Sequence, residues 1–543
     1  MQTQVEREEA IQIPAPPENL RGRMTVGTAL AFFGPGAIIA SLTIGSGEVV
    51  FASRAGAVFG YAVLWAMVAA LVAKGALVYA SNHYITVTGE HPMSRFAKIF
   101  PGPRGWFPIL IGAIALASFP SFASGLSIAL GTYLQDIGLG NAQVWAIGLI
   151  IVAATISYLG GYGPLEKVQI AVVALLLLLV IASVFFTSPD WLGILGGLVP
   201  NIPTYEPWVA EKYPDVVARP EFVEIVTALG ALGGGMYDYV GYTGLLREKK
   251  WGLLGHRDVD AIEDRIANIG GSERIPLSER PEDVRNARQW TSAPLGDTIL
   301  SFTALGIFTL AFLINGVTFL NSRQQVPAED SILTVQQQFI ASIAPIFRYF
   351  YIVAIFLVFF GTIYAIWEVY NRTTYESLGA VSERVRRAGA GRTRPFVYLY
   401  VAVAGILLVL TGLDLVALVT PSTIVGGVLA GGIYAAGLLY VERVTLPPQY
   451  RIGTVARVLL IAAAIFLTVA GLVGLIDYLG IAPWQTARRK WVASSGGTRY
   501  SGCASLPWPS SGWTTAPLPG RPSSAWRRWP TRTSRSASSC RPG

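Results

Sequence analysis

Cysteine, histidine and charged residues are all scarce in this chain. Its 543 residues include 2 cysteines and 3 histidines, and only 14% of them are charged. Both cysteines, Cys503 and Cys540, follow the last long apolar run, which excludes a disulfide or a thiolate metal site from the apolar part of the chain. The chain also lacks a G-x-x-x-x-G-K-[ST] phosphate loop, an H-E-x-x-H motif and a Cys/His cluster. We therefore expect neither an enzyme nor a bound cofactor.

Apolar residues, by contrast, are abundant. They make up 52% of the chain, and the mean hydropathy is +0.49, which exceeds what a single soluble core needs. A helix that crosses a bilayer takes about 20 mainly apolar residues. Runs of this kind occupy residues 26–50, 61–85, 106–134, 142–160, 165–187, 222–246, 295–320, 346–371, 395–413, 415–440 and 455–478. These runs predict an all-α polytopic membrane protein of eleven spans, with its transmembrane domain at residues 24–478.

Basic residues in the loops indicate the orientation of the chain. The loops after even-numbered spans hold Arg95, Lys98, Arg104, Lys167, Arg247, Lys249, Lys250, Arg257, Arg384, Arg386, Arg387, Arg392, Arg394, Arg443 and Arg451. The loops after odd-numbered spans hold Arg54, then Asp136, then an acidic stretch within 206–221. Because cytoplasmic loops carry the excess of Lys and Arg, we expect residues 1–23 to be a cytoplasmic segment and the protein to lie in a prokaryotic plasma membrane. The net charge of +8 then reflects topology and attraction to membrane lipids, without a nucleic-acid partner.

Three polar segments lie outside the spans. Residues 188–221 are rich in proline and form the predicted external loop, and residues 247–294 form a highly charged cytoplasmic loop with a short helix. We expect this second loop to be a solvated surface; the alternative is a partner-binding role, although no obligate protein partner is inferred. Residues 484–543 are rich in Ser, Arg, Pro and Trp, which predicts disorder or the product of a shifted reading frame.

The first span contains a break. Gly45, Ser46, Gly47 and Glu48 interrupt its apolar run near the middle. Unpaired backbone groups survive at this depth only beside a cavity or a bound solute, and an ionisable residue inside a span is a functional candidate by default. We therefore predict that this break forms part of a substrate site, with Glu48 as a ligand.

The sixth span has a second break, at Gly233, Gly234 and Gly235, followed by Tyr237 and Asp238. Breaks in the first and sixth spans are typical of two five-helix repeats of opposite orientation, with a solute bound where the breaks meet. The alternative for the glycines is close helix packing. Asp238 is the second candidate metal ligand. Tyr237 and Tyr239 are candidate caps for the site; the alternative is that they only line the helix.

A third charge, Lys74, falls about halfway along the second span. We expect it to tune the site by pairing with Glu48. The alternatives are that it occupies the place of a coupling cation or that it faces an anionic solute.

The segment GPGAIIASLTIGSGEVVFASRAGAVFGYAVLW, residues 34–65, resembles the first-helix region of the Nramp divalent-metal transporters. In that family a GP pair, an Asp-Pro-Gly-Asn break and an AGA-x-x-GY-x-LLW run occur at the same spacing. The segments VTGEHPMSRFA and GPLEKVQIAVVALLLLLVIASVFF, at 87–97 and 163–186, also match. The resemblance covers residues 24–190 well and extends weakly to 478. It implies a LeuT-like fold of five plus five helices with an eleventh added, and a secondary transporter that works by alternating access.

This sequence differs from the family at the motifs to which metal binding and proton transfer are attributed in that family. The Asp-Pro-Gly-Asn motif falls on residues 45–48, so a carboxylate stands at Glu48 where the family has asparagine. The Met-Pro-His motif of the sixth helix has no clear counterpart, since one register places residues 234–236 there and another places residues 237–239. The third span, 106–134, lacks the acidic groups of the family's proton route.

Two functions remain open from the sequence. Carboxylates and carbonyls suit a hard cation such as Mg²⁺ or Mn²⁺, so we expect a small inorganic ion, a divalent metal, as the transported substrate. The alternative is an amino-acid transporter of the same superfamily, whose Gly-Ser/Ala-Gly break holds a substrate carboxylate on exposed amides. Glu48 would repel such an anion, which places this alternative second. A scaffold without transport would not need two broken helices.

Overall fold

The structure is a computed structural model that describes residues 10–22, 25–32, 45–160, 163–326 and 332–481. The chain divides into two compact units, Met1–Gln485 and Thr486–Gly543. The second unit lies outside the described residues, and so does the tail predicted at 484–543.

The first unit is helical, as predicted. Its long helices are α5 (Leu64–Thr88), α7 (Trp106–Asp136), α8 (Ala142–Leu159), α9 (Gly163–Phe186), α17 (Ser292–Asn315), α19 (Phe347–Gly379), α21 (Ala390–Leu410) and α24 (Thr454–Tyr478). The tenth predicted span is a run of α22 (Leu415–Ser422), the π-helical turn η6 (Thr423–Leu429) and α23 (Ala430–Thr445). In the described part of the chain, 8 stretches are long and apolar enough to cross a membrane, which confirms a multi-pass membrane protein.

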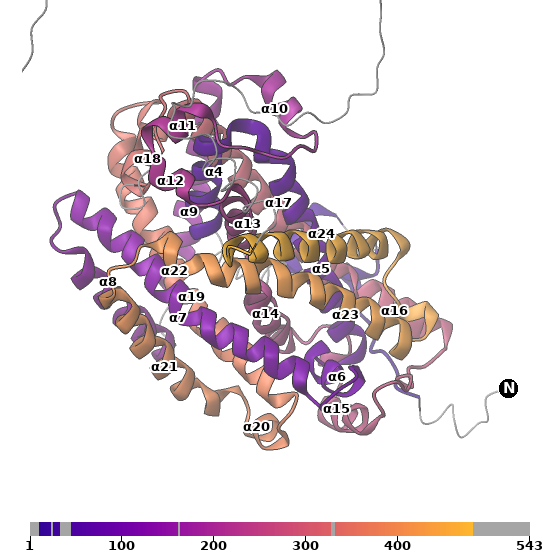
Figure 1. The fold of residues 1–543 in the computed structure, drawn as a ribbon. Helices are drawn as coiled ribbons and strands as arrows, with labels where there is room; N and C mark the ends of the chain where they lie inside the picture. The colour runs from indigo at the N-terminus through magenta and orange to yellow at the C-terminus, as the bar shows by residue number, and fades with distance from the viewer. Residues whose placement is uncertain (1–9, 23–24, 33–44, 161–162, 327–331, 482–543) are drawn as a thin grey trace, which may run out of the picture. The chain divides into compact units, whose positions relative to one another are not determined.

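The sixth predicted span, and the described residues of the first, form shorter helices. The first includes α2 (Val26–Phe32), the π-helical turn η2 (Ser46–Phe51) and α4 (Ala52–Phe59), and the sixth is split into α13 (Glu221–Ala231) and α14 (Met236–Lys249). Figure 1 places α13 and α14 in the middle of the unit, where α13 contacts η2 and η6 and α14 contacts α5, α7 and α19. The two half-helices of the sixth span are therefore surrounded by the other spans.

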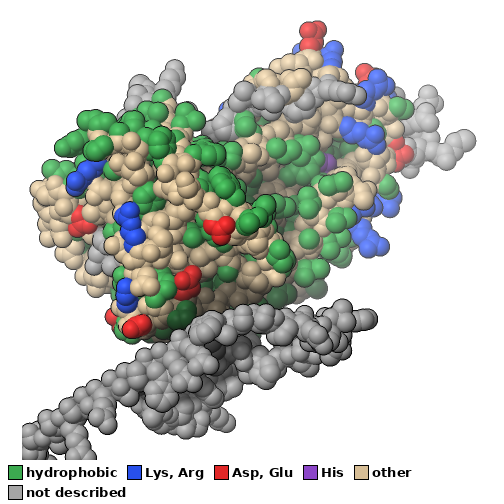
Figure 2. Space-filling view, turned by 90° about the horizontal axis from the view of Figure 1, so that it is seen from above, with side chains coloured by type: hydrophobic (Ala, Val, Ile, Leu, Met, Phe, Trp, Pro, Cys, Tyr) green, Lys and Arg blue, Asp and Glu red, His purple; other side chains and the backbone are tan. Residues whose placement is uncertain are grey.

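Short helices fill the connections between the spans. They are α6 (Pro92–Ile99), α10 (Trp191–Gly197), α11 (Pro207–Lys212), α12 (Pro214–Ala218), α15 (Val259–Asn268), α16 (Pro281–Trp290), α18 (Ile332–Ala341) and α20 (Glu383–Ala388). Figure 2 shows that charged side chains on one face of the molecule gather mostly toward its two ends, with hydrophobic side chains between them. This distribution fits a belt that faces lipid.

The charged loop at 247–294 differs from the solvated surface that we predicted. It contains two helices, α15 and α16, and it packs against the N-terminal segment. The backbone N–H of Ile11 donates to the Pro276 carbonyl at 2.8 Å, and Trp290 Nε1 donates to the Pro14 carbonyl at 2.8 Å. Ile11 and Leu277 are both buried, so apolar residues between the charges anchor this loop.

The end of the first span also differs from the prediction. We expected the span to end at residue 50 and Arg54 to lie in a loop, but the helix continues through α4 to Phe59. Arg54 is buried there, and its Nε lies 2.5 Å from Glu224 Oε1 on α13. The ion pair with Glu224 allows the helix to carry an arginine beyond the predicted end of the span.

Backbone geometry explains the break in the sixth span. Gly233 and Gly234 have φ angles of +66° and +81°, in a region that residues with a Cβ adopt only at a cost. Close helix packing, the other explanation for glycines in a span, applies to Gly47 and Gly230. An added Cβ at these positions would collide with the carbonyls of Ala231 and Thr423. The glycines of the break therefore turn the chain, whereas their neighbours allow helices to approach closely.

We predict that Gly233→Ala destabilises the protein by about 1–2 kcal/mol, because alanine resists the left-handed conformation. The measurement is the thermal unfolding of the purified protein in detergent. Gly148→Ala is the matched control, because Gly148 lies within α8 and an added Cβ would meet nothing within 4 Å. That change should be neutral or slightly stabilising. Equal melting temperatures for the two variants would contradict the prediction.

Candidate functional site

Glu48 links the two broken spans. It lies in the first turn of η2, with its side chain fully buried, where the start of a helical segment favours a negative charge. Its Oε1 accepts a hydrogen bond from the backbone N–H of Gly233 at 2.9 Å. Its Oε2 is buried without a hydrogen-bond partner among the described residues. One carboxylate oxygen of Glu48 thus hydrogen-bonds to the sixth span, and the other has no hydrogen-bond partner among the described residues.

Asp238 has a similar arrangement at the other side of the break. It lies in the first turn of α14, and its Oδ2 accepts a hydrogen bond from the backbone N–H of Gly235 at 2.8 Å. Its Oδ1 is also buried without a hydrogen-bond partner in the part of the chain that the structure describes. The start of each half-helix therefore carries one carboxylate oxygen that the protein itself does not use.

Lys74 contacts the same break, although in a different way from the one we predicted. Its side chain reaches from α5 and is fully buried. No ion pair within 4 Å joins it to Glu48 among the described residues. The distances from Nζ to the carbonyl oxygens of Leu229, Gly230, Leu232 and Gly234 are 2.8, 3.0, 2.6 and 2.6 Å. The ammonium is therefore held by backbone carbonyls, and it influences Glu48 from a distance.

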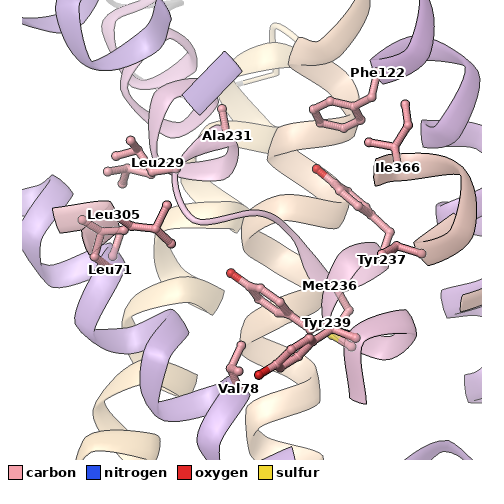
Figure 3. Packing of buried hydrophobic residues seen from close by; sticks show 14 of the residues in the cluster. Leu71, Val78, Phe122, Leu229, Ala231, Met236, Tyr237, Tyr239, Leu305 and Ile366 are labelled. Carbon is pink, nitrogen blue, oxygen red and sulfur yellow. The ribbon is translucent and has the colours of Figure 1, made fainter. Parts of the chain in front are cut away.

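Tyr239, the other tyrosine considered as a cap, also binds the break. Its hydroxyl donates to the carbonyls of Gly233 at 2.7 Å and Gly234 at 3.1 Å. Tyr237, the predicted cap, points away toward Phe122 on α7, and the two rings lie 5.2 Å apart (Figure 3). Residues two apart on a helix lie on nearly opposite faces, so the sequence alone did not decide which tyrosine faces the break.

The glycines of the first break lie against other spans. A side chain at Gly45 would come within 2.8 Å of Thr362 Oγ1 on α19, and one at Gly47 would collide with the Ala231 carbonyl. The backbone of Ser46 begins η2, and its side chain lies outside the described residues. This close approach brings the first span onto the sixth at its break.

No histidine lies at the break, as the sequence indicated. His91 caps α6, where its Nε2 donates to the Val240 carbonyl at 3.1 Å and its Nδ1 accepts from the backbone N–H of Met93. Burial lowers the pKa of His91, so its ring stays neutral at neutral pH. The described residues also contain no cluster of three or more His, Cys, Asp or Glu side chains that could hold a metal ion. Any metal bound at the break would complete its coordination with water or backbone oxygens.

Ion pairs lie at both ends of the sixth span. In the first turn of α13, Glu224 pairs with Arg54 at 2.5 Å and with Arg219 at 3.0 Å. In the last turn of α14, Arg247 pairs with Glu376 on α19 at 3.2 Å and also with Glu263 on α15. A polar cavity of about 440 Å³ lies beside this second set, lined in part by His91, Arg247 and Glu376.

The chain is similar in sequence to a known protein family and in fold to solved structures. A family model described as natural resistance-associated macrophage protein-like matches residues 36–477. A structure of a mutant of the Eremococcus coleocola manganese transporter is similar at 15% identity and a TM-score of 0.58, covering 89% of this chain and 94% of that one. Another structure of that transporter, in complex with an aromatic bis-isothiourea substituted compound, is similar at 14% identity and a TM-score of 0.59, with the same coverage. This likeness concerns the fold, and it confirms the predicted LeuT-like arrangement.

We predict that Tyr239→Phe destabilises the protein by about 1–3 kcal/mol, because the Gly233 carbonyl loses the donor that Tyr239 provides and the Gly234 carbonyl keeps only Lys74. Thermal unfolding in detergent measures this effect. Tyr133→Phe is the matched control: Tyr133 is also buried, but its hydroxyl has no hydrogen-bond partner among the described residues. A loss of stability in the control as large as in Tyr239→Phe would show that the hydrogen bonds at the break are not the cause.

Proposed function

This chain belongs to the natural resistance-associated macrophage protein-like (Nramp) family, and we propose that it binds its divalent metal substrate through Glu48 and Asp238. Members of the family transport divalent metal ions, so the chain is a metal transporter and not an enzyme. The metal is the transported substrate, and no cofactor is involved. The family match does not favour the alternative of an amino-acid transporter.

The unpartnered carboxylate oxygens carry the proposal. Glu48 Oε2 and Asp238 Oδ1 are buried without partners among the described residues, and a buried, unpaired polar group is costly. A cation bound between the two carboxylates would give these oxygens the partner that they lack. With Lys74 nearby, two carboxylates and one ammonium leave one net negative charge if all three are ionised. That balance favours a cation over an anion.

The chemistry of these oxygens favours a hard ion. Carboxylate oxygens, carbonyls and water suit Mg²⁺ and Mn²⁺, whereas thiolates and thioethers select softer metals. Mg²⁺ keeps several of its waters when one or two carboxylates bind it. Two carboxylates without a histidine or cysteine therefore fit a partly hydrated Mg²⁺ or Mn²⁺.

The ion pairs at the two ends of the sixth span support alternating access. Arg54–Glu224 and Arg247–Glu376 lie at the two ends of the broken span, and in this proposal the site releases no ion while both pairs are formed. Opening one set at a time would expose the site to one side of the membrane only. The cavity beside Arg247 would then be the route to the cytoplasm.

We further propose a cytoplasmic N-terminus in a plasma membrane. The support is the charge of the loops: α20, between α19 and α21, carries Arg384, Arg386 and Arg387, whereas the segment with α11 and α12 carries Glu206, Glu211 and Asp215. Cytoplasmic loops are the ones with excess Lys and Arg.

We predict that Glu48→Gln and Asp238→Asn each slow Mn²⁺ uptake into liposomes about tenfold or more, because each change removes a charged ligand. Glutamine keeps an oxygen that can accept from the Gly233 N–H, so the variant should still fold. A metal-sensitive dye inside the liposomes reports the uptake. Asp136→Asn is the control, since this carboxylate is exposed at the end of α7. Uptake at the parent rate in both site variants would contradict the proposal.

The orientation predicts which side of the membrane a labelling reagent reaches. With Cys503 and Cys540 replaced by serine, a cysteine at Arg384 should resist a membrane-impermeant maleimide added to intact cells. A cysteine at Glu211 should react with it. Both residues are exposed, so access depends on the side of the membrane. The reverse pattern would overturn the proposed orientation.

A further inference from the structure

We propose that the Lys74 ammonium is a built-in cation, which occupies a monovalent-cation site formed by the carbonyls of the broken sixth span. Removing the lysine would open this site to a free ion of similar size, such as potassium or ammonium. If the chain also transports a divalent metal as proposed above, no free monovalent ion needs to bind at this place during transport.

The number and distances of the carbonyls carry the inference. Four carbonyl oxygens lie 2.6–3.0 Å from Nζ, but an ammonium has only three N–H groups. More oxygens than N–H groups therefore lie close to the charge, as they do around a coordinated ion. All four distances exceed the roughly 2.0–2.1 Å of Mg²⁺, and those to Leu229 and Gly230, at 2.8 and 3.0 Å, also exceed the roughly 2.3–2.6 Å of Ca²⁺. In potassium channels, rings of backbone carbonyls likewise replace the hydration shell of the ion.

The break leaves these carbonyls without the N–H donors that an unbroken helix would provide. In an unbroken helix the Leu229 carbonyl would accept from the N–H of Gly233, and the Gly234 carbonyl from the N–H of Asp238. Instead, the N–H of Gly233 donates to Glu48, and the N–H of Asp238 donates to the Gly235 carbonyl. The carbonyls at the end of α13 thus lose their helical donors, and the negative end of the helix dipole favours a cation there.

The position of Lys74 argues against an ordinary surface lysine. Its side chain is fully buried in the second span, and a charge inside a membrane is costly unless it is compensated. No carboxylate lies within 4 Å of Nζ among the described residues, so the carbonyls provide the nearest compensation. A lysine that only filled space would not need four of them.

Lys74→Met tests the inference, because methionine keeps much of the length of the side chain without the charge. The purified full-length variant is melted in choline, sodium, potassium and ammonium chloride at equal ionic strength, and its binding of radioactive rubidium, a stand-in for potassium, is measured. We expect the variant to melt at a lower temperature than the parent in choline, and potassium or ammonium to restore much of the difference. We also expect saturable rubidium binding that the parent lacks.

Lys98→Met is the matched control. Lys98 also donates to backbone carbonyls, those of Ala267 at 2.8 Å and Ile266 at 3.4 Å, but it lies on α6 outside the spans and its side chain is 13% exposed. Water can replace its ammonium, so its melting temperature should not depend on which monovalent cation is present.

Several outcomes would overturn the inference. One is a Lys74→Met protein that melts at one temperature in all four salts and binds no rubidium. Another is a variant that does not fold even in potassium, because a site for that ion must let it replace the ammonium. A third needs no variant: uptake of Mn²⁺ by the parent that stops when choline replaces sodium and potassium. Absence of any Mn²⁺ uptake would instead count against the proposed function, while the rubidium result would still decide on the cation site.

Discussion

The structure depends on one constraint: backbone N–H and C=O groups inside a membrane need partners, because lipid offers none. Breaking the sixth span frees such groups near the middle of the bundle. Two carboxylates, Glu48 and Asp238, accept from the freed N–H groups. Lys74 and Tyr239 donate to the freed carbonyls. Side chains from the second, first and sixth spans therefore stabilise a break that a membrane would otherwise not tolerate.

This pairing decides which atoms remain for a solute. The carbonyls of the break, which the sequence suggested as ligands, accept hydrogen bonds from Lys74 and Tyr239. The carboxylates each retain one free oxygen. A divalent ion that enters the site would therefore meet carboxylate oxygens first, beside a fixed positive charge. Such a site should bind weakly enough to release its ion, which a transporter requires and a storage protein does not.

Much of the fold could be predicted from the sequence because the membrane makes its patterns strict. Long apolar runs located the spans, and consecutive glycines located the break at Gly233, where the φ angle requires glycine. The predictions that were wrong concerned long side chains and contacts between residues far apart in the sequence. A lysine can reach partners on several neighbouring helices, so the contact of Lys74 with carbonyls could not be told from a pair with Glu48. The helical position of Arg54 depended on Glu224, which lies 170 residues away in the chain. The roles of Glu48 and Asp238 as ligands stay predictions.

The most direct test of the account is the position of a bound metal. Crystals of the protein soaked in Mn²⁺ can be measured for anomalous scattering, which locates the ion without assumptions about its ligands. The account predicts one peak in the membrane-spanning region, within coordination distance of Glu48 Oε2 and Asp238 Oδ1, with Lys74 still on the carbonyls of the sixth span. A peak surrounded by those carbonyls with Lys74 displaced, or a peak away from both carboxylates, would contradict it.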